Sequence, residues 1–147
     1  MPMKIIATLT LILIALSANA QTDVRQRFGD FNVHYSVFNS SFIDPQIASV
    51  HGLTRGDDIA MVNIAVTRVN AGEESLGLPA EVQGRLQNLI MQSRDLEFVE
   101  IREGGATYYL ADFRIDDEDP QHFYIDIRPQ GVTFPFKLEF TRTLYVD

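Results

Sequence analysis

The sequence contains no cysteine and no tryptophan among its 147 residues. Without cysteine the chain forms no disulfide, offers no thiolate to a metal ion and provides no thiol nucleophile, so packing alone must hold its fold. A Gly-x-Ser-x-Gly nucleophile elbow and a glycine-rich phosphate-binding loop are also missing. These absences exclude thiol chemistry, and we find no sequence signature of a serine hydrolase or of a cofactor.

Basic residues are fewer than acidic ones: 12 Lys and Arg stand against 20 Asp and Glu, which gives a net charge of −8 at pH 7. A negative surface repels nucleic acid and anionic lipid at long range. We therefore expect neither of them as a partner.

The N-terminus has the pattern of a cleavable secretory signal. Lys4 is followed by an apolar stretch over residues 5–18, which is shorter than the roughly 20 residues of a membrane-spanning helix. Small residues at the −3 and −1 positions then predict cleavage between Ala20 and Gln21. We expect residues 21–147 to form one exported domain without membrane insertion. An uncleaved N-terminal anchor is the alternative.

Alternation of apolar and polar residues dominates the rest of the chain. Residues 31–38 alternate as a half-buried strand does, and residues 59–69 are rich in β-branched side chains, as a central strand is. Further strands are predicted over 96–101, 107–115, 121–127 and 133–146, with turn residues between them. This spacing predicts an all-β fold: an antiparallel, immunoglobulin-like sandwich of seven or eight strands.

The segment 80–93 fits two patterns. Val82, Leu86, Leu89 and Ile90 would lie on one face of a helix. Alternate residues from 80 to 90 also form a period-two row, and Gly84 would weaken a helix by about 1 kcal/mol relative to alanine. We predict a strand, and an α+β fold with one helix near 80–92 is the alternative.

Several short motifs resemble, in their order along the chain, those of the DUF4426 family of exported bacterial proteins of unknown function. They are Phe28-Gly29-Asp30, His34-Tyr35-Ser36, Asn39-Ser40-Ser41-Phe42, Gly52-Leu53-Thr54-Arg55, Asn63-Ile64-Ala65-Val66, Val82-Gln83-Gly84, Asn88-Leu89, Arg102-Glu103-Gly104 and Tyr108-Tyr109. The resemblance covers nearly all of residues 21–147. It implies a single domain exported in Gram-negative bacteria, hence a periplasmic location. It brings no activity, cofactor or catalytic residue.

Metal-binding patterns are weak. The three histidines, His34, His51 and His122, are not spaced so that two could share a metal ion on one element. The acidic run 116–119 lacks the spacing and the turn glycine of an EF-hand loop, so we interpret it as a solvated turn. We predict no metal site.

Six residues are candidates for binding: two polar residues on a strand face or in a turn, two asparagines inside predicted strands, where asparagine is normally depleted, and two adjacent tyrosines, of which a strand would expose one. They are His34, Arg55, Asn63, Asn88, Tyr108 and Tyr109. The sequence favours a non-catalytic sandwich that binds a protein or another envelope component. The alternative is a small-ligand or cation-binding protein, or an enzyme, with a site built from loops around His34, Arg55 or the acidic turn.

Overall fold

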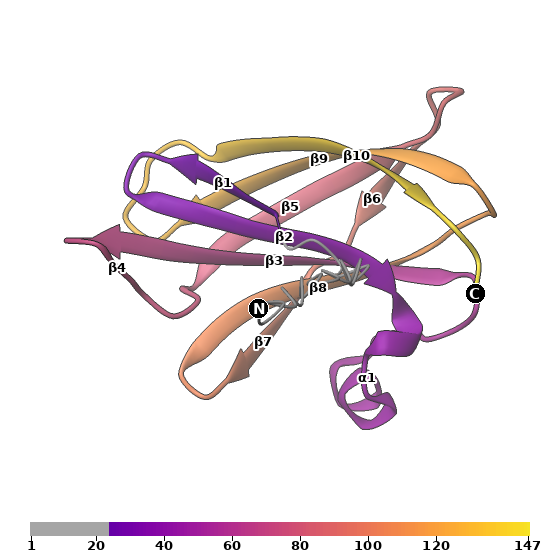
Figure 1. The fold of residues 1–147 in the computed structure, drawn as a ribbon, viewed down its shortest axis with the longest axis horizontal. Helices are drawn as coiled ribbons and strands as arrows, with labels where there is room; N and C mark the ends of the chain where they lie inside the picture. The colour runs from indigo at the N-terminus through magenta and orange to yellow at the C-terminus, as the bar shows by residue number, and fades with distance from the viewer. Residues whose placement is uncertain (1–23) are drawn as a thin grey trace, which may run out of the picture.

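The computed structural model describes residues 24–147, which form a two-layered β-sandwich (Figure 1). The predicted signal and the cleavage point between Ala20 and Gln21 lie outside the described residues. The elements in chain order are β1 (Val24–Phe28), β2 (Phe31–Asn39), the 3-10 turn η1 (Ser40–Phe42), α1 (Pro45–His51), β3 (Ile59–Asn70), β4 (Glu73–Glu74), β5 (Ala80–Gln87), β6 (Ser93–Leu96), β7 (Val99–Glu103), β8 (Ala106–Arg114), β9 (Asp119–Pro129) and β10 (Phe136–Leu144).

All strand pairs are antiparallel. Sheet 1 has the order β1-β2-β3-β8-β7, with β4 paired to the end of β3, and sheet 2 has the order β10-β9-β5-β6. The predicted all-β antiparallel sandwich is confirmed. Residues 24–147 contain ten strands rather than seven or eight, because β1 shows no apolar alternation and β4 has only two residues. The predicted strand 96–101 also divides in two.

The division into two strands explains why the alternation of apolar and polar residues is interrupted within residues 96–101. Leu96 ends β6 in sheet 2, and Val99 begins β7 in sheet 1, so the chain changes sheet at Glu97 and Phe98. Each half alternates within its own sheet, and the residues between them belong to neither. A phase shift between two short alternating runs here marks a crossover between layers.

Segment 80–93 contains a strand, and the alternative of a helix near 80–92 is wrong. β5 pairs with both β6 and β9, and it ends at Gln87. A Cβ atom on Gly84 would lie 3.1 Å from the carbonyl oxygen of Tyr124 and 3.3 Å from the ring of Phe98. A side chain at position 84 would therefore crowd the neighbouring strand β9 and the ring of Phe98, which glycine avoids.

The single helix of residues 24–147 lies where the sequence showed only turn signals. Asp44 caps α1 by accepting a hydrogen bond from the Gln46 amide at 2.7 Å, and Pro45 occupies the first turn. Gly52 ends α1 with a φ of 68°. Asp44 and Pro45 together mark the start of a helix, and Gly52 marks its end. No helix of residues 24–147 is long and apolar enough to cross a membrane.

The last strand begins later than predicted. β10 starts at Phe136 rather than at residue 133, because Pro135 cannot donate a backbone hydrogen bond to the sheet. Phe134, inside the predicted range, lies before β10 and is 78% exposed.

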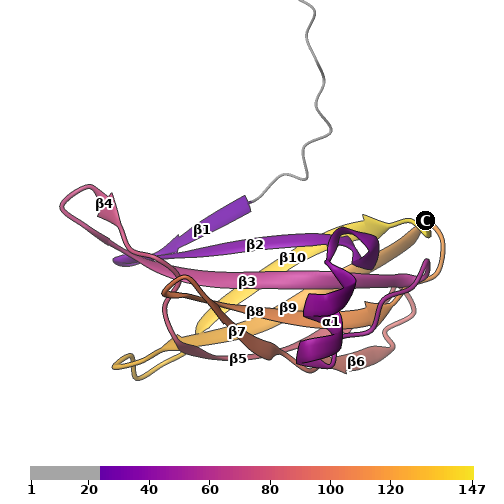
Figure 2. The same ribbon diagram turned by 90° about the horizontal axis from the view of Figure 1, so that it is seen from below.

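Two separate cores stabilise the domain. The main core fills the space between the sheets, where the rings of Phe123 and Phe140 stack at 4.7 Å. A smaller core lies on the outer face of sheet 1, where α1 covers part of the sheet (Figure 2). Its buried members are Ala48, Leu53, Met61, Ile101 and Leu110. The rest of that outer face carries polar side chains.

Candidate functional site

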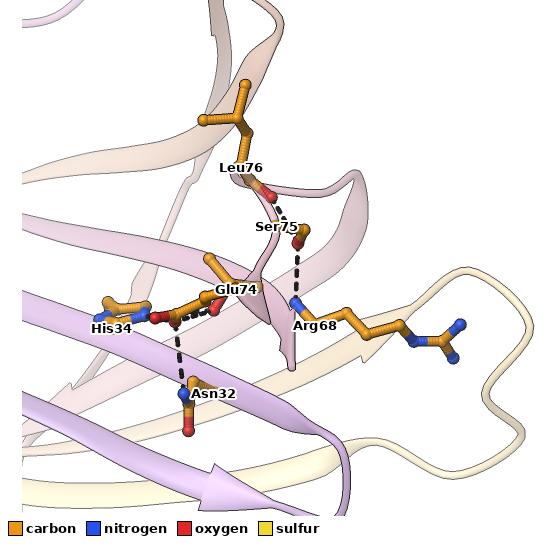
Figure 3. A network of polar contacts seen from close by, with 7 residues as sticks. Asn32, His34, Arg68, Glu74, Ser75 and Leu76 are labelled. Atoms are coloured by element: carbon orange, nitrogen blue, oxygen red, sulfur yellow. Dashed lines mark hydrogen bonds and ion pairs between the residues drawn. The ribbon is translucent and has the colours of Figure 1, made fainter. Parts of the chain in front are cut away.

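A network of hydrogen bonds converges on Glu74 at the uncovered part of sheet 1 (Figure 3). The Oε1 atom of Glu74 accepts hydrogen bonds from His34 Nε2 at 2.6 Å, from Asn32 Nδ2 at 3.3 Å and from the hydroxyl of Thr67. His34 Nε2 also lies 3.2 Å from Thr67 Oγ1. One carboxylate oxygen thus joins side chains from β2, β3 and β4.

Local sequence explains this convergence. Asn32 and His34 are two positions apart on β2 and face the same side, and Thr67 is the cross-strand partner of Asn32. The chain then turns back after β3, so that Glu74 pairs with Val69 at the end of that strand. Gly72, with a φ of 81°, permits the turn.

The hydrogen bonds lower the pKa of Glu74 to about 2, with the bond from Thr67 contributing most, then those from His34 and Asn32. Burial opposes them. About a third of each side chain in the His34–Glu74 pair remains exposed to water. A carboxylate this acidic is a weak base at neutral pH, so the arrangement suits holding the β4 turn against the sheet better than proton transfer.

Ser36 lies on the same strand as His34, and Glu74 could orient the imidazole. However, none of the hydrogen bonds found within residues 24–147 joins Ser36 to His34. Ser36 is also only 7% exposed. The serine is therefore neither activated by the histidine nor open to a substrate, and the three side chains do not form a nucleophilic triad.

The other candidates occupy separate positions. Arg55 donates to the carbonyl oxygens of Ser40 and Ser41, at 3.2 and 3.4 Å, and so ties its loop to η1. Tyr108 donates to Glu103 at 3.2 Å. These contacts stabilise local structure, and neither residue shares a hydrogen bond with the Glu74 network.

Tyr109 and Asn63 are turned toward the protein. The Tyr109 hydroxyl accepts from the Ala80 amide at 2.8 Å and donates to Glu100 at 3.1 Å. It thereby links the two sheets, and burial raises the pKa of Tyr109. Asn63 Oδ1 is buried without a hydrogen-bond partner beside Ser36, its cross-strand neighbour.

Asn88 was predicted inside a strand, and this is wrong: β5 ends one residue earlier. Asn88 instead organises the turn between β5 and β6. Its Oδ1 accepts from the amides of Ile90 and Gln92, at 3.1 and 2.9 Å, and its carbonyl oxygen accepts from the Met91 amide at 3.1 Å. The Asn88 amide and side chain also bond to Gln92, at 3.1 and 2.9 Å. One asparagine therefore fixes a five-residue turn.

This turn, residues 88–92, presents three consecutive large apolar side chains to solvent. Leu89, Ile90 and Met91 are 77%, 73% and 75% exposed. Figure 1 shows the β5–β6 connection extending beyond the body of the sandwich. Contiguous exposed apolar side chains on a soluble domain mark sites of interaction. We call residues 88–92 the apolar turn.

Sequence reasoning missed the apolar turn because it placed residues 88–90 inside the strand predicted for segment 80–93, and grouped Leu89 with Ile90 only on the face of the alternative helix. The available signal was an asparagine followed by three apolar residues, which breaks the alternation. Glu74 and Thr67 were also missed. Thr67 lies 33 residues from His34 and Glu74 lies 40, so only the pairing of strands brings them together.

Acidic and histidine side chains do not gather into a metal centre in the described part of the chain: residues 24–147 contain no group of three or more His, Asp or Glu that could hold a metal ion. The acidic turn uses its carboxylates locally. Asp119 accepts from the Asp116 amide at 3.2 Å, and Asp117 accepts from the Val146 amide at 3.1 Å.

Comparison with known proteins gives a family and a fold. The model of the family described as "Domain of unknown function (DUF4426)" matches residues 25–147. The crystal structure of a DUF4426 family protein from Pseudomonas aeruginosa PAO1 has a TM-score of 0.76 at 34% identity, and covers 87% of this chain and 98% of its own. No curated protein matches the chain.

Two structures of FetP from uropathogenic Escherichia coli strain F11 are also similar. A copper-bound variant has a TM-score of 0.64, and the protein as isolated after expression in the periplasm of E. coli has 0.62. Both are 10% identical to this chain; each covers 84% of it, and 95% and 94% of their own lengths. At this identity the likeness shows a shared fold.

Proposed function

Since this chain belongs to the DUF4426 family, to which no activity is attached, we propose a function from its surface. The protein is an exported, non-catalytic binding module of the periplasm, and it contacts a protein or another envelope component through the apolar turn. The secretory pattern ending at Ala20 supports export.

The observation that carries the proposal is the ordered exposure of Leu89, Ile90 and Met91. An exposed turn without a binding role normally carries polar side chains, because exposed apolar side chains favour aggregation. Here the hydrogen bonds of Asn88 hold the turn in one conformation. Less conformational entropy is then lost when a partner covers these side chains, which favours binding.

The alternative of a loop-built catalytic or cation site has less support. His34, Arg55 and the acidic turn do not share hydrogen bonds with one another among residues 24–147, and each satisfies local backbone or side-chain groups. Copper binding, known for one FetP variant, is left out of the proposal, because the described residues bring no three candidate ligands together.

Site-specific photocrosslinking in the cell envelope tests the proposal. A photoreactive side chain at Ile90 should form crosslinks that the same side chain at Leu76 does not. Leu76 is a matched control, because it is also exposed and lies between β4 and β5, away from the apolar turn. Equal crosslinking at both positions, or none at Ile90, would contradict the proposal.

Export is tested separately by the intact mass of the protein recovered from the periplasm. We expect a chain that begins at Gln21. A chain that still begins at Met1 would show that the signal is not removed.

A further inference from the structure

We propose that the apolar turn binds the surface of a zwitterionic lipid bilayer, with Leu89, Ile90 and Met91 entering the boundary between headgroups and acyl chains. The inference rests on the proposed function, since it names the envelope component that the turn contacts. It concerns shallow insertion of one turn and requires no membrane-spanning segment.

The residues around the turn follow the order of layers in a bilayer. Leu89, Ile90 and Met91 form the tip, and neutral amide side chains flank it: Asn88 and Gln92 at the two ends of the turn and Gln87 at the end of β5. Along each strand the first charged residue beyond this collar is a cation, Arg85 on β5 and Arg94 on β6, and Asp95 lies opposite Arg85. Apolar groups favour the acyl region, polar amides the interface and arginines the level of the phosphates.

The backbone of the tip is prepared for a medium with little water. The amides of Ile90, Met91 and Gln92 all donate to Asn88, two to its side-chain oxygen and one to its carbonyl oxygen. An unpaired amide carried out of water would cost free energy, so this internal pairing removes a barrier to insertion.

Both arginines are held beside the turn. Arg85 donates to Ser93 at 3.2 Å and lies 4.0 Å from the centre of the Tyr124 ring. Arg94 donates to the carbonyl oxygen of Arg114 at 2.8 Å, so it points toward the body of the sandwich from β6. Both guanidinium groups are therefore held against the sandwich behind the turn, so the apolar tip and its amide collar would meet a bilayer before either cation does.

Charge selects the kind of lipid. The Arg94–Arg114 hydrogen bond links β6 to the end of β8, just before the acidic residues 116–119. These carboxylates and the net charge of −8 repel an anionic surface. A neutral bilayer is therefore the partner that fits both the apolar tip and the acidic surroundings.

The absence of tryptophan makes the test direct. In the mature chain, the Ile90→Trp variant supplies one fluorescent indole at the tip, and Leu76→Trp supplies one at the matched exposed position. With phosphatidylcholine vesicles, we expect a blue shift and quenching by bromine-labelled acyl chains for Ile90→Trp alone. Binding should be reversible, with an association constant at or below the roughly 10⁴ M⁻¹ of a single myristoyl chain.

Composition and salt sharpen the test. Vesicles containing phosphatidylglycerol should bind more weakly, and added salt should restore binding because it screens the repulsion. Replacing Leu89, Ile90 and Met91 by serine should abolish co-flotation with neutral vesicles. Stronger binding to anionic vesicles, or unchanged flotation of the serine variant, would overturn the inference.

The outcomes separate this inference from the proposed function. If vesicles leave the Ile90→Trp emission unchanged while crosslinks from position 90 recover a protein, lipid binding is wrong and the binding module stands. A concentration-dependent shift without vesicles would replace lipid with a second copy of the chain. If neither vesicles nor crosslinking give a signal at position 90, both proposals fail.

Discussion

The two turns that follow β3 and β5 use a polar side chain in opposite ways. After β3, Glu74 reaches back to His34 and Thr67, so its turn is tied to the sheet. After β5, Asn88 bonds only within its own turn, and the apolar side chains are left outside. The first arrangement attaches the turn to sheet 1. The second gives a rigid turn whose side chains are free to contact something else.

The largest expected loss of stability comes from a substitution just after β4, where the first turn is hydrogen-bonded to β8. Gly77 accepts a hydrogen bond from the Thr107 amide at 2.9 Å, and a Cβ there would lie 2.2 Å from the Thr107 carbonyl oxygen. We expect Gly77→Ala to lower the free energy of unfolding by about 3 kcal/mol, because backbone must move to admit the methyl group. Denaturant unfolding measures it.

Gly56→Ala is the control for that substitution. Its Cβ would meet the side chain of Ile59 at 3.2 Å, and a side chain can shift more cheaply than backbone. An equal loss in both variants would show that close approach to β8 is not the cause.

Removing the carboxylate of the first turn should have the next largest effect. We expect Glu74→Ala to cost about 1–3 kcal/mol, since it leaves His34, Asn32 and Thr67 without their shared acceptor. Glu73→Ala is the matched control, because Glu73 is exposed on the same two-residue strand. Hydrogen exchange of β4 amides should rise only in the Glu74 variant.

The pKa of Glu74 predicts how this contribution depends on pH. The folded-state pKa is lowered from 4.5 to about 2, so the stabilisation is complete above the ordinary value and is lost as pH falls toward 2. The stability difference between the wild type and Glu74→Gln should therefore shrink between pH 5 and 2, by an amount that exposure to water reduces. A constant difference across that range would contradict the assignment.

Loosening the second turn should cost less. We expect Asn88→Ala to lower the free energy of unfolding by about 1 kcal/mol, because the lost hydrogen bonds are local and partly replaced by water. Amide exchange should increase over residues 89–92 and leave β4 unchanged. Exchange that rises in both turns would show that they are coupled.

The smallest effect on stability is expected from the apolar side chains themselves. Replacing Leu89, Ile90 and Met91 by serine should change the free energy of unfolding by no more than about 0.5 kcal/mol, because these side chains are exposed. Thermal melting measures this. A large loss of stability would mean that the side chains pack against the fold and are not displayed for binding.

The sequence predicted the fold class well because alternation reports burial directly. The central strand β3 and the strand character of β5 both follow from local patterns of side chains. The ends of the helix and strands were predicted less accurately where a residue type is common both in that element and in a turn. Asn88 continued a period-two row and was placed in a strand, while Asp44 and Pro45, which are residue types common in turns, begin α1.

The candidate sites were predicted less well, because they depend on contacts far apart in the sequence. His34 was identified as a polar residue on its strand, but its partner Glu74 lies 40 residues away. Nothing local distinguishes Glu74 from Glu73. The apolar turn was missed for a different reason: apolar residues are assigned to the core by default, and only the tertiary structure shows that these three face solvent.

The aromatic contacts between the two sheets also bear on how fast the domain folds. Phe28 of β1 stacks on Phe136 of β10 at 4.9 Å, and Tyr35 stacks on Phe140 at 4.5 Å. These rings come from opposite ends of the described chain, so the sandwich closes only when its most distant strands meet. Chains with such non-local contacts fold in milliseconds to seconds. Until then, the apolar faces of both sheets remain exposed to other chains, and this domain has no disulfide to shorten the search.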